Sequence, residues 1–357
     1  MRKRKILIVQ NELANYRIPV FTHLNKYYDL TVLHMKGNVY NEEFKTIKFK
    51  GLQYHIKGFH FTPGVGKIAK AFDVIILPFD LWWFNLVLLP VRLRRKSFIF
   101  WGHGLGRTNS SSLSVTIRKM LSKSVNALLF YSKETKRQFI QKTHVKEEKC
   151  FVAANTVEVS NAGVDLLTKK KYFLYLGRLQ ERKGLDVFLK AYALLEPEMK
   201  EEYSVLLVGE SQLDFKETLL RLSEELNISK YVQFENGTYD PEKVKEYFTS
   251  ALAYVSPNHV GLGVVHSLAF GIPVITQSDE AIHAPEFTYC NTGNSYLYEV
   301  TGNSTHEIVL AENLKLAMSD EKLYQSKSKE AFNTYAENCT LDNMVLGFAE
   351  AIEYSAG

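Results

Sequence analysis

Short apolar runs alternate with longer amphipathic segments along most of this chain, and this alternation constrains its fold more than any other feature. Such runs are typical of strands buried on both faces, and helices between them indicate parallel pairing. A first series of strands is predicted at Lys5–Val9, Leu30–His34, Val74–Leu77, Phe98–Trp101, Ala127–Tyr131 and Cys150–Ala153. A second series is predicted at Tyr172–Leu176, Ser204–Val208, Val232–Phe234, Ala253–Val255 and Pro273–Thr276. The sequence therefore predicts an α/β protein with two doubly wound parallel sheets.

The interruption between the two series predicts two domains, which also fits a length of 357 residues. We predict a Rossmann-like domain over residues 1–157, a polar linker over 158–171 and a second domain over 172–339. A final helix over 340–357 is expected to complete the first domain. Ligands of open parallel sheets bind beyond the carboxyl ends of the strands. We therefore expect two domains that face each other across a cleft, with functional residues in the loops after strands.

The composition excludes several classes of protein. Lys and Arg (44) outnumber Asp and Glu (39) only slightly, which argues against a nucleic-acid partner. The three cysteines, Cys150, Cys290 and Cys339, are far apart, so neither a disulfide framework nor a zinc site is expected, and a reducing cytoplasm is favoured. The apolar run at residues 6–9 is too short for a signal peptide, and the stretch 73–91 is broken by polar residues and a proline. We expect a cytoplasmic protein without a membrane span.

A loop rich in cations follows the strand predicted at Tyr172–Leu176. Gly177 ends this strand, Arg178 and Lys183 follow, and a helix is predicted to start near Gly184. Two cations beside a helix N-terminus favour an anion, because free N–H groups and the helix dipole add to the fixed charges. The alternative is a solvated basic loop.

A turn with two glycines follows the strand predicted at Ala253–Val255. Gly261 and Gly263 precede a short apolar helix, and Gly271-Ile272-Pro273 leads into the next strand. Exposed backbone N–H groups at such a turn predict a second anion site. A tight structural turn explains the glycines equally well.

Together these segments resemble the retaining, nucleotide-sugar-dependent glycosyltransferases of glycosyltransferase family 4, which have the GT-B fold. The resemblance covers most of the second half of the chain. The matching segments, in order, are Gly177–Gly184, Val205–Glu210, Phe234–Gly237 and Ala269–Val274. The resemblance implies transfer of a hexosyl or N-acetylhexosaminyl group from a UDP- or GDP-type sugar donor to a hydroxyl of a glycan or lipid-linked acceptor, with retention of configuration.

The resemblance also implies roles for individual residues. Arg178 and Lys183 would hold the diphosphate, while Glu210 and the turn Asn236–Thr238 would lie near the nucleoside. The backbone of Gly261–Gly263 would contact the donor sugar or phosphate. The donor-binding residues that it implies are Gly177, Glu210, Asn236, Gly237, Thr238, Asn258, Gly261, Leu262, Gly263, His266 and Glu286.

The chain departs from the family pattern at one point. The family usually carries two Glu eight positions apart, where this chain has Asn258 and His266. A neutral His266 could share the ribose contact as donor or acceptor, whereas Asn258 could bond a sugar hydroxyl but supplies no charge. A histidine in an apolar helix is equally explained as a core residue. With Pro285-Glu286-Phe287, the pattern resembles a His-containing subgroup found in bacterial surface-polysaccharide assembly, in which Glu286 would restore a carboxylate near the donor.

The resemblance is thinner in the first half of the chain. His103 follows the strand predicted at Phe98–Trp101, at a point where the family commonly has a His close to the transferred sugar. It is therefore expected to be a hydrogen-bonding group of the active site, with a structural histidine as the alternative. Asn15 and Arg17, in the loop after the first strand, are expected to face phosphate or the acceptor.

The chain contains no Asp-x-Asp, so transfer is expected to need neither a metal nor a cofactor. Arg178, Lys183 and helix dipoles would neutralise the leaving diphosphate instead. Two other functions stay open: a non-catalytic binding subunit of a glycosyltransferase complex, and a sugar-nucleotide epimerase. The replacements at Asn258 and His266 keep the binding-subunit hypothesis open, while the two cations Arg178 and Lys183 argue against it.

Residues 81–96 place aromatic residues and leucines next to four cations. This pattern predicts either an interfacial patch that docks on anionic lipid or a core-packed helix with a basic C-terminus. The first interpretation would make the protein peripheral on the inner face of the cell membrane.

Overall fold

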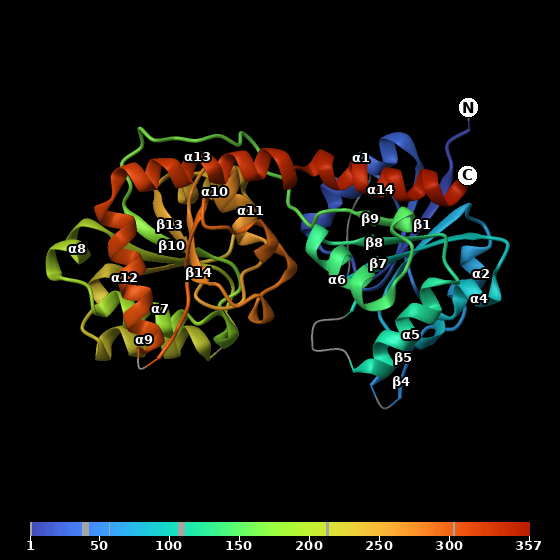
Figure 1. Cartoon of the computed structure of the whole chain (residues 1–357), viewed down its shortest axis with the longest axis horizontal. Coiled ribbons are helices and arrows are strands. Elements are labelled where there is room, and N and C mark those ends of the chain that lie inside the picture. Colours follow the sequence, from blue (N-terminus) through green and yellow to red (C-terminus); the bar gives the residue numbers. More distant parts are fainter. Residues whose placement is uncertain (1, 38–42, 57, 106–110, 212–213, 303) are drawn as a thin grey trace. The chain divides into compact units, whose positions relative to one another are not determined.

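A computed structural model describes residues 2–37, 43–56, 58–105, 111–211, 214–302 and 304–357 of the chain (Figure 1). The chain divides into two compact units, Met1–Glu158 with Thr340–Gly357, and Val159–Cys339. Each unit is built on its own parallel sheet with helices on both faces, which confirms the predicted α/β class.

The sheet of the first unit has seven parallel strands in the order β3-β2-β1-β6-β7-β8-β9. Its strands are β1 (Lys5–Glu12), β2 (Asp29–Lys36), β3 (Lys45–Lys48), β6 (Val74–Pro78), β7 (Ser97–Gly102), β8 (Ala127–Phe130) and β9 (Cys150–Val152). The chain runs outward from β1 in one direction and from β6 in the other. This reversal is the switch point at which open parallel sheets bind ligands.

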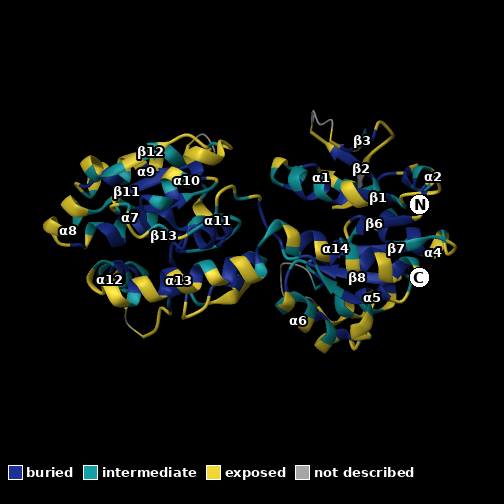
Figure 2. Cartoon of the chain, turned by 90° about the horizontal axis from the view of Figure 1, so that it is seen from above, coloured by how far each residue is buried: buried dark blue, intermediate teal, exposed yellow. Residues whose placement is uncertain are grey.

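The strands of this sheet send alternate side chains into two separate cores. Ile6 and Ile8 of β1 pack on one face with α1 (Ile18–Tyr27) and α14 (Leu341–Ala356). Leu7 and Val9 pack on the other face. The helices of that second face are α2 (Val65–Ala69), α3 (Phe84–Val87), α4 (Leu89–Arg92), α5 (Ser112–Ser122) and α6 (Lys133–Thr143). Figure 2 shows the strands as the buried layer and exposed residues on the outer sides of the helices.

An aromatic cluster lies where a hairpin meets residues 81–96. The hairpin consists of β4 (Tyr54–Ile56) and β5 (Phe59–Phe61), paired antiparallel. The Phe59 ring lies 5.2 Å from the Trp82 ring and 6.3 Å from the Phe84 ring, and Trp82 and Phe84 are 56% and 44% exposed. Of the leucines behind them, Leu86 and Leu89 are buried in the core, and Leu81, Leu88 and Leu93 are partly buried against it. The segment forms the two short helices α3 and α4 rather than one helix, and its interpretation as a lipid-docking patch stays a prediction.

The sheet of the second unit has six parallel strands in the order β12-β11-β10-β13-β14-β15. Its strands are β10 (Tyr172–Leu176), β11 (Ser204–Val208), β12 (Val232–Glu235), β13 (Ala251–Val255), β14 (Val274–Gln277) and β15 (Ser295–Tyr298). Its helices are α7 (Leu185–Ala193), α8 (Pro197–Glu202), α9 (Phe215–Glu225), α10 (Pro241–Thr249), α11 (Gly263–Ala269), α12 (His306–Ser319) and α13 (Glu321–Asn338). The direction of the chain reverses here between β10 and β13.

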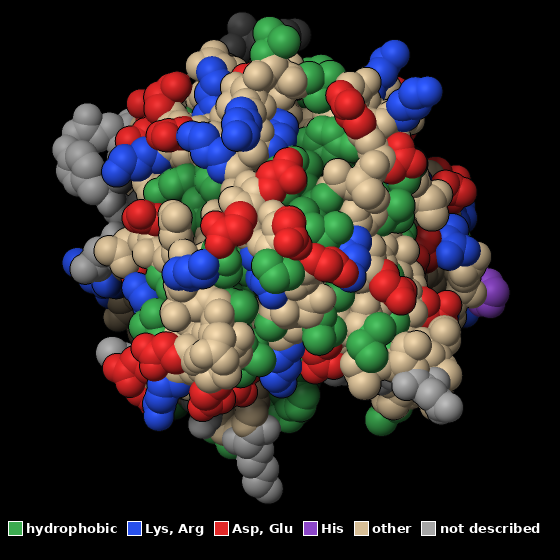
Figure 3. Space-filling model, turned by 90° about the vertical axis from the view of Figure 1, so that its left-hand side faces the viewer, with side chains coloured by type: hydrophobic (Ala, Val, Ile, Leu, Met, Phe, Trp, Pro, Cys, Tyr) green, Lys and Arg blue, Asp and Glu red, His purple; other side chains and the backbone are tan. Residues whose placement is uncertain are grey.

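The charges on the surface bear on the expected absence of a nucleic-acid partner, and the helices bear on the expected absence of a membrane span. The face drawn in Figure 3 carries Lys and Arg intermixed with Asp and Glu, and no basic patch dominates it. Within the described residues, no helix combines the length and the apolar character that crossing a membrane requires. All three cysteines are buried and free.

Candidate functional site

The candidate site of the second unit lies at the carboxyl ends of the strands that flank its switch point. Gly177 follows β10, Gly209 follows β11, and the turn at residues 256–262 connects β13 to α11. Gln277 is the last residue of β14. The predicted donor-binding segments therefore meet at one edge of one sheet.

Glycines let these loops touch through their backbones. A Cβ on Gly209 would lie 1.8 Å from the carbonyl oxygen of Gly177, and a Cβ on Gly263 would lie 2.9 Å from that of Leu176. The amide of Leu179 donates to the carbonyl oxygen of Glu210 at 2.9 Å, which joins the loops after β10 and β11. No residue with a side chain fits at Gly209 or Gly263 without moving backbone.

Lys183 is the centre of this site. It ends a short 3-10 helix (Glu181–Lys183) directly before α7, and its Nζ donates to the carbonyl oxygen of His259 at 2.6 Å. The carbonyl oxygen of Lys183 accepts from the amide of Asn258 at 3.2 Å. A Cβ on Gly261 would lie 3.6 Å from Nζ, so the turn after β13 surrounds the ammonium group.

Charges gather around this ammonium group. Burial, together with the nearby charges of Arg182 and Arg178, lowers the pKa of Lys183 to about 8, although the charge of Glu286 acts to raise it. Glu286 is 4% exposed and lies in a 3-10 helix (Pro285–Tyr289). Arg178 is exposed, and its carbonyl oxygen accepts from the Tyr175 hydroxyl at 2.9 Å. Three cations and one buried carboxylate thus lie close enough to interact beside the glycine backbone of these loops.

Gly184, directly after Lys183, requires a left-handed conformation. Its φ is +68°, and a Cβ there would lie 2.9 Å from Nδ2 of Asn258. The Asn258 side chain accepts from Nε2 of Gln277 at 2.8 Å, which ties the start of α7 to the end of β14. Asn258 therefore also positions the loops, a role that its predicted contact with a sugar does not include.

His283, which was not among the residues predicted from the sequence, positions the same turn. The amide of Val260 donates to Nδ1 of His283 at 3.0 Å, so the proton is on Nε2, which lies 2.9 Å from the carbonyl oxygen of Gln277. The ring stacks on Phe287 with centroids 4.2 Å apart. Burial lowers the pKa of His283 to about 4, so the ring is neutral at pH 7. The only sequence signal was its place two residues before Pro285.

His266 is packed differently from the other predicted residues. Its ring lies on α11 and stacks on Phe248 of α10, with centroids 5.8 Å apart. Burial lowers its pKa to about 4, and its Nδ1 is buried without a hydrogen-bond partner. One face of the ring thus belongs to the core, while one nitrogen stays unsatisfied.

Glu210 and the turn after β12 form the outer part of the site. Glu210, Asn236 and Gly237 are exposed. A Cβ on Gly237 would lie 3.4 Å from Cγ of Glu210. The hydroxyl of Thr238 accepts from the amide of Asp240 at 3.0 Å, which fixes the turn. The structure thus places these four predicted residues together in the second unit.

The predicted residues of the first unit also lie after its strands. Arg17 ends a 3-10 helix (Asn15–Arg17) after β1, and Asn15 is exposed. His103 follows β7, and its ring lies 4.7 Å from the ring of Tyr131, which follows β8. Arg17 donates from Nη2 to the Tyr131 hydroxyl at 3.3 Å.

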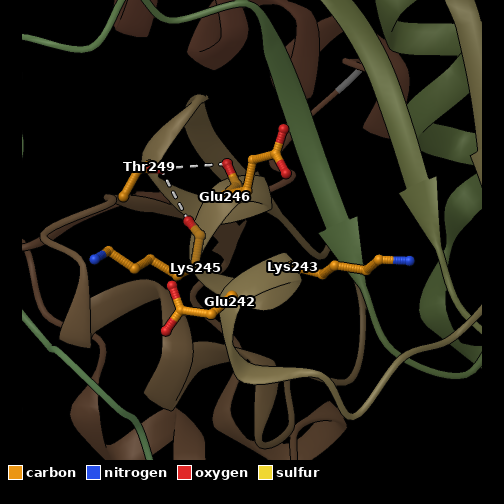
Figure 4. Close-up of a pocket in the computed structure, with 5 residues that line it drawn as sticks. All are labelled: Glu242, Lys243, Lys245, Glu246 and Thr249. Carbon is orange, nitrogen blue, oxygen red and sulfur yellow. Dashed lines mark hydrogen bonds between the residues drawn. The ribbon is translucent and has the colours of Figure 1, made fainter.

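A shallow hollow on α10 is separate from these residues. Figure 4 shows it lined by Glu242, Lys243, Lys245, Glu246 and Thr249. The Thr249 hydroxyl bonds to backbone carbonyl groups of its own helix. No residue predicted for the site lines it.

Residues 160–337 match the family described as "Glycosyl transferases group 1". The chain is 27% identical over 220 residues to an N-acetylgalactosamine-N,N'-diacetylbacillosaminyl-diphospho-undecaprenol 4-alpha-N-acetylgalactosaminyltransferase of Campylobacter jejuni, a match that covers 59% of this chain and 56% of that protein. It is 34% identical over 111 residues to a D-inositol 3-phosphate glycosyltransferase of Thermomonospora curvata, which covers 29% of this chain and 26% of that protein. The chain thus spans about half or less of the length of these curated relatives.

The fold is also similar to solved structures over nearly the whole chain. Anabaena Alr3699/HepE in complex with UDP matches with a TM-score of 0.74 at 13% identity, covering 98% of this chain and 99% of that chain. The predicted GT-B fold and the broader resemblance to glycosyltransferases are confirmed. The finer assignment to family 4 and to its His-containing subgroup stays a prediction. By its match over residues 160–337, the second unit of this GT-B chain is a domain of the glycosyl transferases group 1 family.

Proposed function

We propose that this chain transfers a hexosyl or N-acetylhexosaminyl group from a nucleotide-diphosphate-sugar to a hydroxyl of a glycan or lipid-linked acceptor. The observation that carries the proposal is the Lys183 ammonium group, enclosed by the turn after β13 and flanked by Arg178. The site lies at the switch point of its sheet, where such folds bind ligands.

The charges suit a leaving diphosphate. An ammonium group has three N–H donors, and among the described residues that of Lys183 has one hydrogen-bond acceptor, the carbonyl oxygen of His259. The others are available to phosphate oxygens, and Arg178 adds a guanidinium fork. As the bond between the anomeric carbon and the diphosphate breaks, negative charge grows on the departing oxygen. Donors already held in place stabilise that charge.

We propose that transfer retains the anomeric configuration. The acceptor hydroxyl would enter from the face that the diphosphate leaves, and its proton would pass to the departing phosphate oxygen. Arg178 and Lys183 supply the positive charge, so no metal is required. Transfer that continues in excess EDTA would agree with this proposal, and transfer restored only by added Mg²⁺ would contradict it.

The relatives guide the choice of substrates. Anabaena HepE was solved with UDP and with UDP-glucose, and the Campylobacter relative is named for a diphospho-undecaprenol acceptor. We propose a UDP-sugar donor and a lipid-linked acceptor for this chain. A lipid-linked acceptor requires access to a membrane surface.

The aromatic cluster around Trp82 would provide that access from the cytoplasmic side. Trp82 and Phe84 are exposed, and the exposed basic residues Arg92, Arg94 and Arg95 follow them in the sequence, a composition that suits an anionic bilayer. A Trp82→Ser/Phe84→Ser variant is expected to sediment less with phosphatidylglycerol vesicles. Tyr239→Ser, at an exposed aromatic residue of the second unit, is the control.

The test of the proposed function is turnover of a panel of UDP- and GDP-sugars, followed by release of the nucleoside diphosphate. Lys183→Ala is expected to lower turnover about 100- to 1000-fold, the usual effect of removing one preorganised donor. Lys190→Ala is the matched control, because Lys190 is an exposed cation of α7 that pairs with Asp186. Nucleotide binding without turnover would favour the subunit, and conversion to another sugar nucleotide would favour the epimerase.

A further inference from the structure

Arg17 is a buried cation for which the described residues supply no anionic partner. It is 7% exposed; its Nε donates to the Tyr16 hydroxyl at 3.2 Å and its Nη2 to the Tyr131 hydroxyl at 3.3 Å. Its Nη1 is buried and meets no hydrogen-bond partner in the part of the chain that the structure describes. A guanidinium group taken out of water is unfavourable unless a counter-ion and further hydrogen bonds compensate. Neutral tyrosines supply no counter-ion.

Arg118 of the same unit shows what a structural buried arginine looks like. It is also 7% exposed, and its Nε likewise meets no hydrogen-bond partner among the described residues, but its Nη1 donates to the carbonyl oxygens of Phe79 at 3.2 Å and Gly104 at 2.6 Å. These bonds tie α5 to the loops after β6 and β7, which accounts for the burial of Arg118. Arg17 makes no comparable bond to backbone.

The described residues around Arg17 offer more donors, and no carboxylate among them pairs with its guanidinium group. The guanidinium carbon lies 4.3 Å from the centre of the Trp101 ring, and the Nε1 of Trp101 is likewise buried without a partner among these residues. Tyr16 and Tyr131 accept bonds from Arg17, so their own hydroxyl protons remain to be donated. Such a group of donors selects a ligand that is negatively charged and rich in acceptors.

The position fits a ligand site. Arg17 follows β1, which borders the switch point of its sheet, and Tyr131 follows β8. We propose that Arg17 binds a phosphate or diphosphate group carried by the acceptor. This inference rests on the proposed function, in which Lys183 and Arg178 of the second unit take the diphosphate of the donor. An anion bound at Arg17 would then be distinct from the donor diphosphate. A lipid-linked diphosphate acceptor would supply such an anion.

Fluorine NMR of the full chain labelled with 5-fluorotryptophan tests the inference. The chain has three tryptophans, and substitutions at Trp82 and Trp83 assign the signal of Trp101. The titration uses a Lys183→Ala background, so that the site of the second unit does not contribute. Inorganic pyrophosphate is expected to shift the Trp101 signal saturably, and acetate at equal ionic strength is not.

Two variants decide the result. Arg17→Gln is expected to weaken the pyrophosphate response about ten- to hundredfold, the range for a lost hydrogen bond to a charged group. Arg137→Gln, at an exposed arginine of α6, removes the same charge and is expected to leave the response intact. A Trp101 signal that does not move, or that moves equally in Arg17→Gln, overturns the inference and assigns the unpaired donors to buried water.

A second arm identifies the source of the phosphate. Farnesyl diphosphate in micelles replaces pyrophosphate, and a saturable shift that Arg17→Gln abolishes supports a lipid-linked ligand. A response to pyrophosphate without one to farnesyl diphosphate overturns the lipid-linked assignment. Because these measurements follow binding, they can fail while turnover of the sugar donor succeeds, so the two proposals fail separately.

Discussion

The loops that end the two sheets are built in different ways. In the second unit, backbone meets backbone, since Gly209 lies against Gly177 and Gly263 against Leu176. In the first unit, the corresponding region is built from the side chains of Arg17, Trp101, Tyr131 and His103, and residues 11–17 contain no glycine.

This difference decides which site can be recognised in a sequence. Where two backbone segments lie too close together to leave room for a Cβ atom, only glycine fits. The positions of glycines in the sequence therefore indicate where such loops touch. Arginine, tryptophan and tyrosine also occur where no ligand binds, so their spacing alone does not identify a site. Glycines and cations therefore marked the site of the second unit, whereas Arg17 was predicted only from its position after the first strand, and its burial and its partners became known from the structure.

Substitution of Gly209 is the strongest test of whether the loops of the second unit touch through their backbones. Gly209→Ala would place a methyl group 1.8 Å from the Gly177 carbonyl oxygen, which no side-chain movement relieves. We expect the free energy of unfolding to fall by about 3 kcal/mol or more. Gly163→Ala is the control, because a Cβ there meets no atom within 4 Å. Urea denaturation measures both, and equal stability would mean that these loops do not touch.

The strands were predictable because most of them are continuous apolar runs between helices. Ser204–Val208 and Tyr172–Leu176 were predicted with the bounds that the structure shows. β3 was missed because it is a short edge strand in which two half-buried residues lie between two exposed lysines, and β15 because its serine and tyrosines form no aliphatic run. Residues 81–96 were not divided into two helices, although Pro90 prevents one helix from continuing through them.

The site was predictable only where residue type and spacing carry the chemistry. The structure gathers Arg178, Lys183 and Glu286, although they are up to 108 positions apart, since each follows or precedes a strand of one sheet. His283 binds a backbone amide, and such a bond leaves no pattern in the sequence. Packing alone decides such contacts.

The two buried arginines of the first unit are predicted to behave in opposite ways. Arg118→Met removes charged hydrogen bonds to two carbonyl groups and is expected to lower the free energy of unfolding by about 1.5–3 kcal/mol. Arg17→Met removes a buried charge without a counter-ion, so stability is expected to stay the same or rise. Thermal or urea unfolding of both variants tests this. A loss at Arg17 as large as that at Arg118 would make Arg17 a structural residue.

The pH dependence of nucleotide binding tests the charge in the second unit. Burial and neighbouring cations lower the pKa of Lys183 to about 8, so the ammonium form dominates below that pH and is lost above it. UDP affinity is therefore expected to fall as the pH rises through about 8, by at most about tenfold per pH unit. Lys183→Arg stays charged and is expected to abolish the fall. A wild-type affinity that is constant up to pH 10 would remove Lys183 from the diphosphate site.

His266 combines features of a core residue and of a binding residue. Its ring packs like a core side chain, while its Nδ1 has no hydrogen-bond partner among the described residues. His266→Phe keeps the stack on Phe248 and removes both nitrogens. If a nitrogen contacts the nucleotide, UDP affinity should fall about two- to tenfold, the range for one neutral hydrogen bond. The free energy of unfolding should change little, since phenylalanine also stacks an aromatic ring on Phe248. Calorimetric titration with UDP measures the affinity, and an unchanged dissociation constant would assign His266 to the core. The position eight residues after Asn258 would then contribute packing alone, and donor binding would depend on backbone and on charges near Lys183.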